Sequence, residues 1–135
     1  MKRAVLLLLV SLLCSLGCSK GLATIPPTPS FVSISPQTAA VTCDADACVP
    51  QTIVFTATVK DQNGNLMPNA PVGIAISVNV GFSAHAAITQ GPGQTATMTF
   101  QPGQPPGGTV YATALITTFG GTLVKSQATV AVTQQ

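Results

Sequence analysis

The stretch that decides the fold spans residues 54–72 and reads VFTATVKDQNGNLMPNAPV. Apolar and polar residues alternate up to Lys60, a turn cluster of Gln, Asn and Gly follows, and a second apolar run opens at Pro71. Alternation with a period of two predicts a half-buried β-strand, and Asn-Gly supplies the positive φ angles that tight turns need. The stretch therefore predicts two strands joined by a turn, with Gly64 at a positive φ.

The same alternation continues through the rest of the chain after about residue 30. Besides the strands on either side of the turn, it predicts strands at residues 31–35, 38–42, 95–100, 109–117 and 124–132. Pro36 separates the first two, and a proline cannot donate to a central ladder, so it indicates an edge or a bend. No segment after the leader combines helical periodicity with capping residues. About seven short strands in roughly 100 residues predict an all-β, two-sheet Greek-key sandwich over residues 31–135.

The turn also carries a family resemblance. Its pattern V-x-D-x-x-G-N-x-x-P-x-x-x-V is met by Val59, Asp61, Gly64, Asn65, Pro68 and Val72. In this it resembles bacterial immunoglobulin-like domains of the invasin/intimin type. The resemblance implies an Ig-like sandwich at a bacterial surface, acting as a spacer or adhesive unit. The chain has no Trp, so the Cys-Trp-Cys core of antibody domains is absent, and the segment around Cys43 and Cys48 is not part of the pattern.

The first 30 residues differ from the rest. Lys2 and Arg3 precede a short apolar run, too short to span a bilayer, which predicts a signal peptide at residues 1–17. Leu16-Gly17-Cys18 resembles a lipobox, which implies lipidation of Cys18 and a Pro-rich tether over residues 18–30. Cleavage after Ala23, giving a secreted or periplasmic protein, is the alternative. Ser19 follows the cysteine, and in the lipoprotein systems that this leader resembles it permits sorting to the outer membrane.

The charge of the chain is low and changes when the leader is removed. Only 6% of the residues are charged. Without Lys2 and Arg3, three lysines oppose three aspartates, and scattered lysines cannot form the basic face that nucleic acid requires. We therefore expect no nucleic-acid partner. Because few charges protect the strand edges, self-association is a possible property of the domain.

Cys43 and Cys48 enclose the sequence Asp-Ala-Asp-Ala. In an exported protein such a pair usually becomes a disulfide, which we predict here. A metal site with Asp44 and Asp46, or free thiols, are the alternatives. Two carboxylates alone fall short of what Ca²⁺ requires, and two cysteines do not close a zinc site. No metal and no cofactor are expected.

Residues suited to catalysis are few. The mature chain offers three Asp, one His and no Glu, and His85 is not accompanied by a recognisable nucleophile motif. We interpret His85 as a surface or strand-edge residue and Asp61 as a turn residue that accepts backbone N–H groups. We expect the Asn65 side chain to bond the local backbone of the same turn. The protein is not expected to be an enzyme.

Aromatic residues suggest one alternative to a purely structural role. Phe55 and Phe100 fall on apolar strand faces and are assigned to the core, whereas Phe82, Tyr111 and Phe119 fall on polar faces or in turns. These three are candidates for a shallow carbohydrate or ligand surface.

Taken together, the sequence predicts a non-catalytic lipoprotein of the bacterial cell envelope. Its lipid anchor would hold it to the outer membrane, as Ser19 indicates, where it would act as a structural or protein-interaction module for another envelope or extracellular protein. Two alternatives remain, an adhesin or ligand-binding module and a subunit that assembles through edge-strand pairing. A ligand screen with the soluble domain would test the first, and its sedimentation behaviour the second.

Overall fold

The computed structural model describes residues 25–78, 86–102 and 107–135. The predictions made for residues 1–24, and for Phe82 and His85, lie outside these ranges. The described part contains nine strands and no helix. The strands are β1 (Pro29–Ser35), β2 (Thr38–Cys43), β3 (Cys48–Val49), β4 (Thr52–Asp61), β5 (Gly73–Val78), β6 (Ala86–Gln90), β7 (Thr95–Phe100), β8 (Gly108–Thr117) and β9 (Leu123–Gln134).

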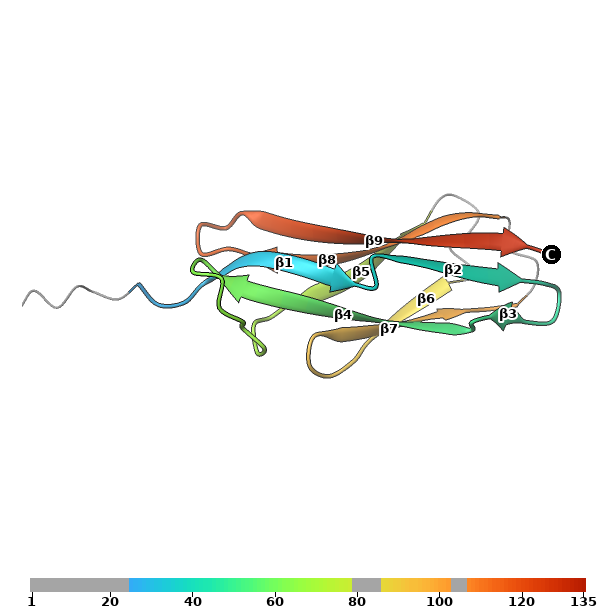
Figure 1. Ribbon diagram of the computed structural model, residues 1–135, viewed down its shortest axis with the longest axis horizontal. Coiled ribbons are helices and arrows are strands. Elements are labelled where there is room, and N and C mark those ends of the chain that lie inside the picture. Colours follow the sequence, from blue (N-terminus) through green and yellow to red (C-terminus); the bar gives the residue numbers. More distant parts are fainter. Residues whose placement is uncertain (1–24, 79–85, 103–106) are drawn as a thin grey trace, which may run out of the picture.

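The strands form two sheets that face each other as a β-sandwich (Figure 1). One sheet has the order β1-β4-β7-β6 and the other β3-β2-β9-β8-β5. All neighbouring strands are antiparallel except β2 and β9, which are parallel. The chain changes sheet between β1 and β2, at Pro36, which confirms the predicted bend there.

The alternation of apolar and polar residues in the sequence coincides with the alternation of buried and exposed residues in the structure. Along β4, every second residue from Ile53 to Asp61 is buried, and β7 buries Ala96, Met98 and Phe100 in the same way. Phe55 and Phe100 lie in the core, as predicted, and are the largest fully buried side chains. Because the two sheets cover each other's inner faces within the described residues, the sandwich builds its own core.

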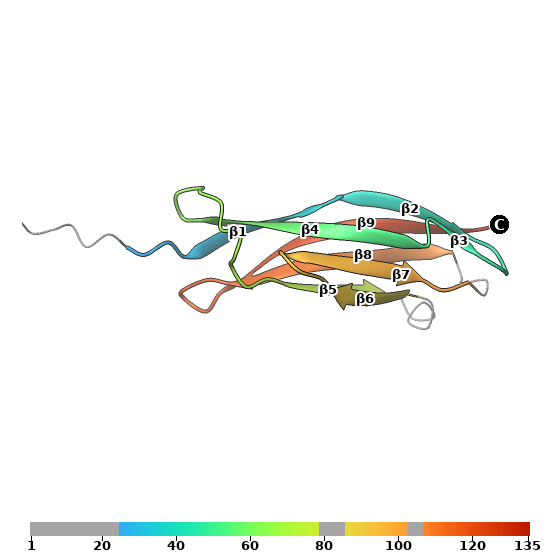
Figure 2. The same cartoon turned by 90° about the horizontal axis from the view of Figure 1, so that it is seen from below.

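A second, smaller group of apolar side chains fills one end of the sandwich. Val59, Ala70 and Ile116 are buried there, with Val32, Met67, Val72 and Val124 packed against them. These residues come from β1, β4, β8, β9 and the connection between β4 and β5. At this end, which we call the N-terminal end, the described chain begins at Ile25, whereas the C-terminus lies at the opposite end of the long axis (Figures 1 and 2).

Two strands were missed by the sequence prediction of about seven. β3 has only two residues, too few to show alternation, and pairs only with β2. β6 reads AAITQ and lies at a sheet edge, where alanine and an exposed surface weaken the strand signal. Strand β1 begins at Pro29, two residues before the predicted start, since the end of the Pro-rich segment pairs with β4.

Candidate functional site

The β4–β5 connection turns around the side chain of Asp61, the last residue of β4. Its Oδ1 accepts the backbone N–H groups of Asn63 and Asn65, each at 2.8 Å, and its Oδ2 accepts the Asn65 side-chain amide at 3.0 Å. The side chain is buried, with a relative exposure of 3%. The hydrogen bond from the Asn65 side chain, followed by those from the backbone, holds the pKa of Asp61 below its ordinary value against the opposing effect of burial.

Gly64 and Asn65 complete this turn. Gly64 has a φ of 84°, so the predicted positive φ is observed, and no heavy atom lies within 4 Å of where its Cβ would be. The expectation for Asn65 needs correction. We expected its side chain to bond the local backbone, but its amide donates to the Asp61 carboxylate instead. A buried carboxylate binds an N–H donor strongly, and Asn65 supplies one at the right place.

After the turn the chain runs back along β4. Leu66 forms a β-bridge with Lys60, and the Met67 N–H donates to the Val59 carbonyl at 2.9 Å. Gln94, the residue before β7, also holds this segment. Its side-chain amide donates hydrogen bonds to the carbonyls of Met67 and Ala70, both at 2.9 Å. Gln94 itself has a positive φ of 65°. The sequence contains no signal for this role of Gln94, since the contact joins segments 24 and 27 residues apart.

The Pro-rich segment is fastened to the same turn by Gln62. Its Oε1 accepts the backbone N–H and the hydroxyl of Thr28, at 2.9 and 3.2 Å, and its Nε2 donates to the Pro26 carbonyl at 3.3 Å. The last residues of the expected tether are therefore packed on the sandwich.

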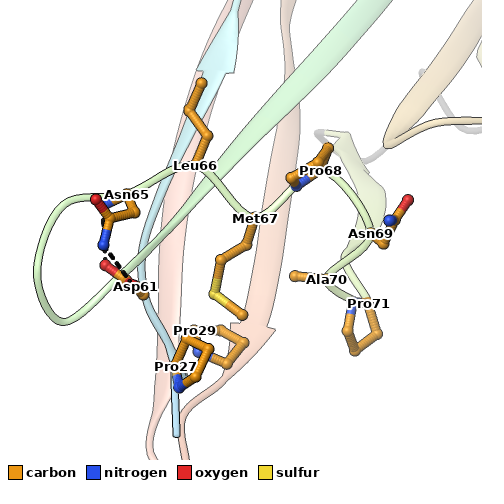
Figure 3. A pocket seen from close by; sticks show the side chains of 10 residues that line it. All are labelled: Pro27, Pro29, Asp61, Asn65, Leu66, Met67, Pro68, Asn69, Ala70 and Pro71. Carbon is orange, nitrogen blue, oxygen red and sulfur yellow. Dashed lines mark hydrogen bonds between the residues drawn. The ribbon is translucent and has the colours of Figure 1, made fainter.

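A groove of 610 Å³ opens between this segment and the connection (Figure 3). It is lined by Pro27, Pro29, Asp61, Asn65, Leu66, Met67, Pro68, Asn69, Ala70 and Pro71. The Met67 side chain points towards Pro27 and Pro29, whereas Leu66 points away from them. Asp61 is the only lining residue that ionises, and its oxygens are engaged in the turn. The groove therefore offers apolar contact surface and no reactive group.

The Cys43–Cys48 disulfide lies at the opposite end, and its prediction is confirmed. The two cysteines form a cross-strand pair between β2 and β3, and both are buried. In the loop between them, Asp44 Oδ1 accepts the N–H groups of Asp46 and Ala47 at 2.8 and 2.7 Å. These two hydrogen bonds, that from Ala47 first, lower the pKa of Asp44. Asp44 thus closes a turn, as Asp61 does.

The proposed aromatic surface is not assembled in the described part of the chain. Tyr111 lies half-buried on the outer face of β8, opposite Ser77 of β5 and Thr129 of β9. Phe119 lies in the turn after β8 and is 89% exposed. The strand residues between Tyr111 and the end of β8 span about 20 Å, so these two aromatics do not meet on one shallow site. Phe82 is outside the described residues.

The described residues also bear on metals and membranes. Within residues 25–78, 86–102 and 107–135, no group of three or more His, Cys, Asp or Glu side chains is placed to hold a metal ion. The same residues include no helix that is long and apolar enough to cross a membrane.

Comparison with known proteins finds no matching protein-family model and no matching curated protein. Among solved structures, one similar chain is described as a nucleoside hydrolase-related hypothetical protein from Saccharophagus degradans that is associated with carbohydrate metabolism. It is 13% identical, with a TM-score of 0.44, and the match covers 81% of this chain but 25% of that one. Another is the ZirS C-terminal domain, 15% identical, with a TM-score of 0.44 over 82% of this chain and 73% of that one. At these levels of similarity neither structure assigns a function to this chain.

Proposed function

We propose that this protein is a non-catalytic, Ig-like lipoprotein of the bacterial cell envelope that acts as a structural or protein-interaction module. The observation that carries the proposal is the position of the two ends of the described chain. Ile25 and Gln135 lie at opposite ends of an elongated sandwich (Figure 1), which is the arrangement that a spacer needs. A sandwich of this kind keeps the chain that precedes it at a distance from any partner bound at its far end.

The strand order supports the Ig-like part of the proposal. In an Ig domain of constant type, strands A, B, E and D form one sheet and C, F and G the other. Here β1, β4, β7 and β6 occupy the places of A, B, E and D, and β5, β8 and β9 those of C, F and G. Strand β2 then corresponds to the second half of A, which crosses to the other sheet and pairs in parallel with G.

The non-catalytic part is supported by the roles of the acidic residues. Two of the three aspartates, Asp44 and Asp61, use their carboxylates to accept backbone N–H groups within turns. They lie at opposite ends of the sandwich, so these two carboxylates cannot act together on one substrate. General acid–base catalysis needs titratable groups that are brought together and free to exchange a proton with the substrate.

Anchoring is tested by changing Cys18. Each buried CH₂ of an acyl chain contributes about 0.8 kcal/mol, so a lipidated cysteine holds a protein stably on a membrane once two or three chains are attached. The Cys18→Ala variant should move from the membrane fraction to the soluble fraction. Unchanged fractionation, or a mature wild-type N-terminus at Thr24, would contradict the anchor. Loss of a biological activity in a folded His85→Ala variant would contradict the non-catalytic role.

Assembly through strand edges is a second candidate, favoured by one observation. Among the described residues, β5 and β6 each pair with a strand on one side only, and neither contains a charged residue. Edge strands usually carry charges or prolines that prevent pairing with another chain. If the protein assembles in this way, Thr89→Lys on exposed β6 should abolish higher oligomers in sedimentation, whereas Thr97→Lys on the central strand β7 should not. A monomeric wild type at high concentration would exclude this function.

A further inference from the structure

Large apolar side chains are unevenly exposed over the surface. Seven are exposed in the described part of the chain, and five of them belong to the segments that meet at the N-terminal end: Ile25 (77%), Phe31 (57%), Leu66 (67%), Phe119 (89%) and Leu123 (67%). The other two are Val49 in β3 and Val54 near the start of β4, both away from this end. Single exposed apolar residues are normal, but a group of them at one site usually marks an interaction surface. We call these five residues the apolar end.

Four of the five residues of the apolar end lie on strands and turns that the fold holds in place. Phe31 and Leu66 both lie beside Lys60, through the β1–β4 pairing and the bridge after the turn. Leu123 begins β9 opposite Thr117, and the turn between them carries Phe119. Beneath both groups lies the small buried cluster around Val59 and Ile116. Figures 1 and 2 show the β4–β5 turn and the β8–β9 turn at the same end of the sandwich, where β1 also begins.

The β8–β9 turn presents Phe119 on an ordered backbone. Thr118 N–H donates to the Thr122 carbonyl at 2.9 Å, Gly121 N–H donates to the Thr118 carbonyl at 2.9 Å, and the Thr118 hydroxyl accepts the Thr122 N–H at 3.2 Å. These hydrogen bonds already order the turn in the free protein, so binding through the Phe119 ring requires no further ordering of the backbone. Less conformational entropy is then lost on binding.

The exposed positive and negative side chains lie towards opposite ends of the sandwich. The lysines of the described chain, Lys60 and Lys125, both lie near the apolar end, the first beside Leu66 and the second two residues after Leu123. The acid at this end, Asp61, is buried and occupied by its turn. Asp44 and Asp46 lie at the opposite end, in the β2–β3 loop. A surface of exposed apolar groups flanked by lysines is complementary to an anionic lipid bilayer.

The length of the chain before Ile25 also favours a membrane as the partner of the apolar end. This step rests on the lipid anchor proposed above. Residues 18–24 can span at most about 25 Å, whereas β9 alone, with 12 residues, is about 40 Å long. Gln62 fastens residues 26 and 28 to the β4–β5 turn, so the chain leaves the sandwich at the apolar end. A lipidated Cys18 would therefore keep this end, and not the opposite one, next to the membrane.

We propose that the apolar end is a membrane-docking surface. Phe119, Leu66 and Leu123 enter the interfacial layer of an anionic bilayer, and Lys60 and Lys125 contact its phosphate groups. The sandwich then stands on the membrane with the β2–β3 hairpin and the C-terminus pointing away from it. This proposal goes beyond anchoring, because a lipid anchor with a short tether keeps the apolar end near the membrane but does not by itself place its side chains in the bilayer.

The absence of Trp in the chain allows a direct test with two single-tryptophan variants. Phe119→Trp reports on the apolar end, and Val49→Trp, also at an exposed apolar position, reports on the opposite end. Each full-length protein is purified from membranes and reconstituted into vesicles of phosphatidylcholine and phosphatidylglycerol, with and without brominated acyl chains. Circular dichroism first verifies that both variants have the wild-type fold.

The expected result is that brominated lipid quenches the fluorescence of Phe119→Trp at least twofold more than that of Val49→Trp, and that only the emission of Phe119→Trp shifts to shorter wavelength. Lys60→Glu/Lys125→Glu in the Phe119→Trp background should reduce this quenching. Equal quenching in both variants would overturn the proposal. So would a blue shift of Phe119→Trp that depends on protein concentration in detergent-free solution without vesicles, because it would identify a second copy of the chain as the occupant.

A chain that begins at Ser19 separates this proposal from the anchor. It retains all strands of the sandwich and lacks Cys18, so any sedimentation with anionic vesicles comes from the domain. Sedimentation that decreases in Phe119→Ser/Leu123→Ser, with the fold retained, supports docking even if Cys18→Ala fractionates as wild type and the anchor is wrong. If the Ser19 chain fails to sediment and full-length Phe119→Trp is not quenched, docking is wrong even if the anchor is right.

Discussion

The two turns at the ends of the sandwich, the β4–β5 turn at Asp61 and the β2–β3 turn at Asp44, use the same device in different surroundings. In each, an aspartate Oδ1 accepts two backbone N–H groups. The Asp61 side chain is buried and bonds a third donor on Asn65, and its turn leads into a connection that packs on the core. Asp44 is exposed, and its turn is closed by a disulfide.

The comparison indicates that the same hydrogen-bonding motif contributes unequally to the stability of the two turns. The β4–β5 turn depends on the carboxylate, because the turn contains no covalent link and the Asp61 carboxylate that accepts its three hydrogen bonds is buried. The β2–β3 turn has the disulfide to close it, so the carboxylate adds less. The predictions below test this contrast, from the largest expected effect to the smallest.

Asp61→Ala should produce the largest loss. It removes the acceptor of two backbone N–H groups and of the Asn65 amide, three partly buried hydrogen bonds to a charged group, and such hydrogen bonds are stronger than those between neutral groups. We expect the melting temperature, followed by circular dichroism, to fall by about 10 to 15 °C. A loss no greater than that of Asp46→Ala, at an exposed residue of the other turn, would contradict the importance assigned to the buried carboxylate.

Replacing both Cys43 and Cys48 by Ala should cost about 2 kcal/mol in the free energy of unfolding, since the closed loop is short. The variant should fold, because β2 also pairs with β9 over six residues. Urea denaturation of the oxidised wild type and the variant measures the difference. Complete unfolding of the variant would show that the β2–β3 hairpin contributes more to stability than the β4–β5 turn does.

Gly64→Val should cost about 1 to 2 kcal/mol through backbone strain at its φ of 84°. The space around the position is open, so steric contact contributes nothing. Gly73→Ala, at a glycine with equally open surroundings and no positive φ, serves as the control and should be neutral within about 0.5 kcal/mol. Equal effects in the two variants would mean that the turn is free to rearrange.

Acid should weaken the protein through Asp61 and, to a smaller extent, Asp44, because both pKa values are lowered in the folded state. For a lowered pKa, the stabilisation is fully present above the unfolded pKa of about 3.9 and is lost as the pH falls through the folded value. The melting temperature should therefore be nearly constant from about pH 7 to 5 and decline below about pH 4. Asp61→Asn should remove more of this decline than Asp44→Asn.

Asp44→Ala should have the smallest measurable effect, lowering the melting temperature by about 2 to 5 °C. The two hydrogen bonds to its Oδ1 make Asp44 unsuitable as a silent control. Asp46→Ala is the better control, as nothing in the described structure bonds its side chain. If Asp44→Ala equals Asp46→Ala in a differential scan, the disulfide alone closes this turn.

Much of the local structure could be read from the sequence because it depends on neighbours in the chain. The period-two alternation of residues 52–60 reports which side chains face the core, and Gly64 and Asp61 lie within a few residues of all their turn partners. The Cys43–Cys48 pair is similarly local, five residues apart. These features were predicted since a short segment contains all of the atoms involved.

The rest was decided by the tertiary structure, because it joins segments that the sequence keeps far apart. Gln62 holds Thr28, 34 residues away, and Gln94 holds Ala70, 24 residues away. A glutamine in a turn carries no signal of its distant partner, and the groove between these contacts has no pattern in the sequence. The gathering of Phe31, Leu66 and Phe119 at one end likewise depends on which strand ends meet, and this follows from the order of strands in the two sheets. The sequence by itself determined seven of the nine described strands and the Asp61 turn, and the pairing of the strands decided the shape and chemistry of the two ends.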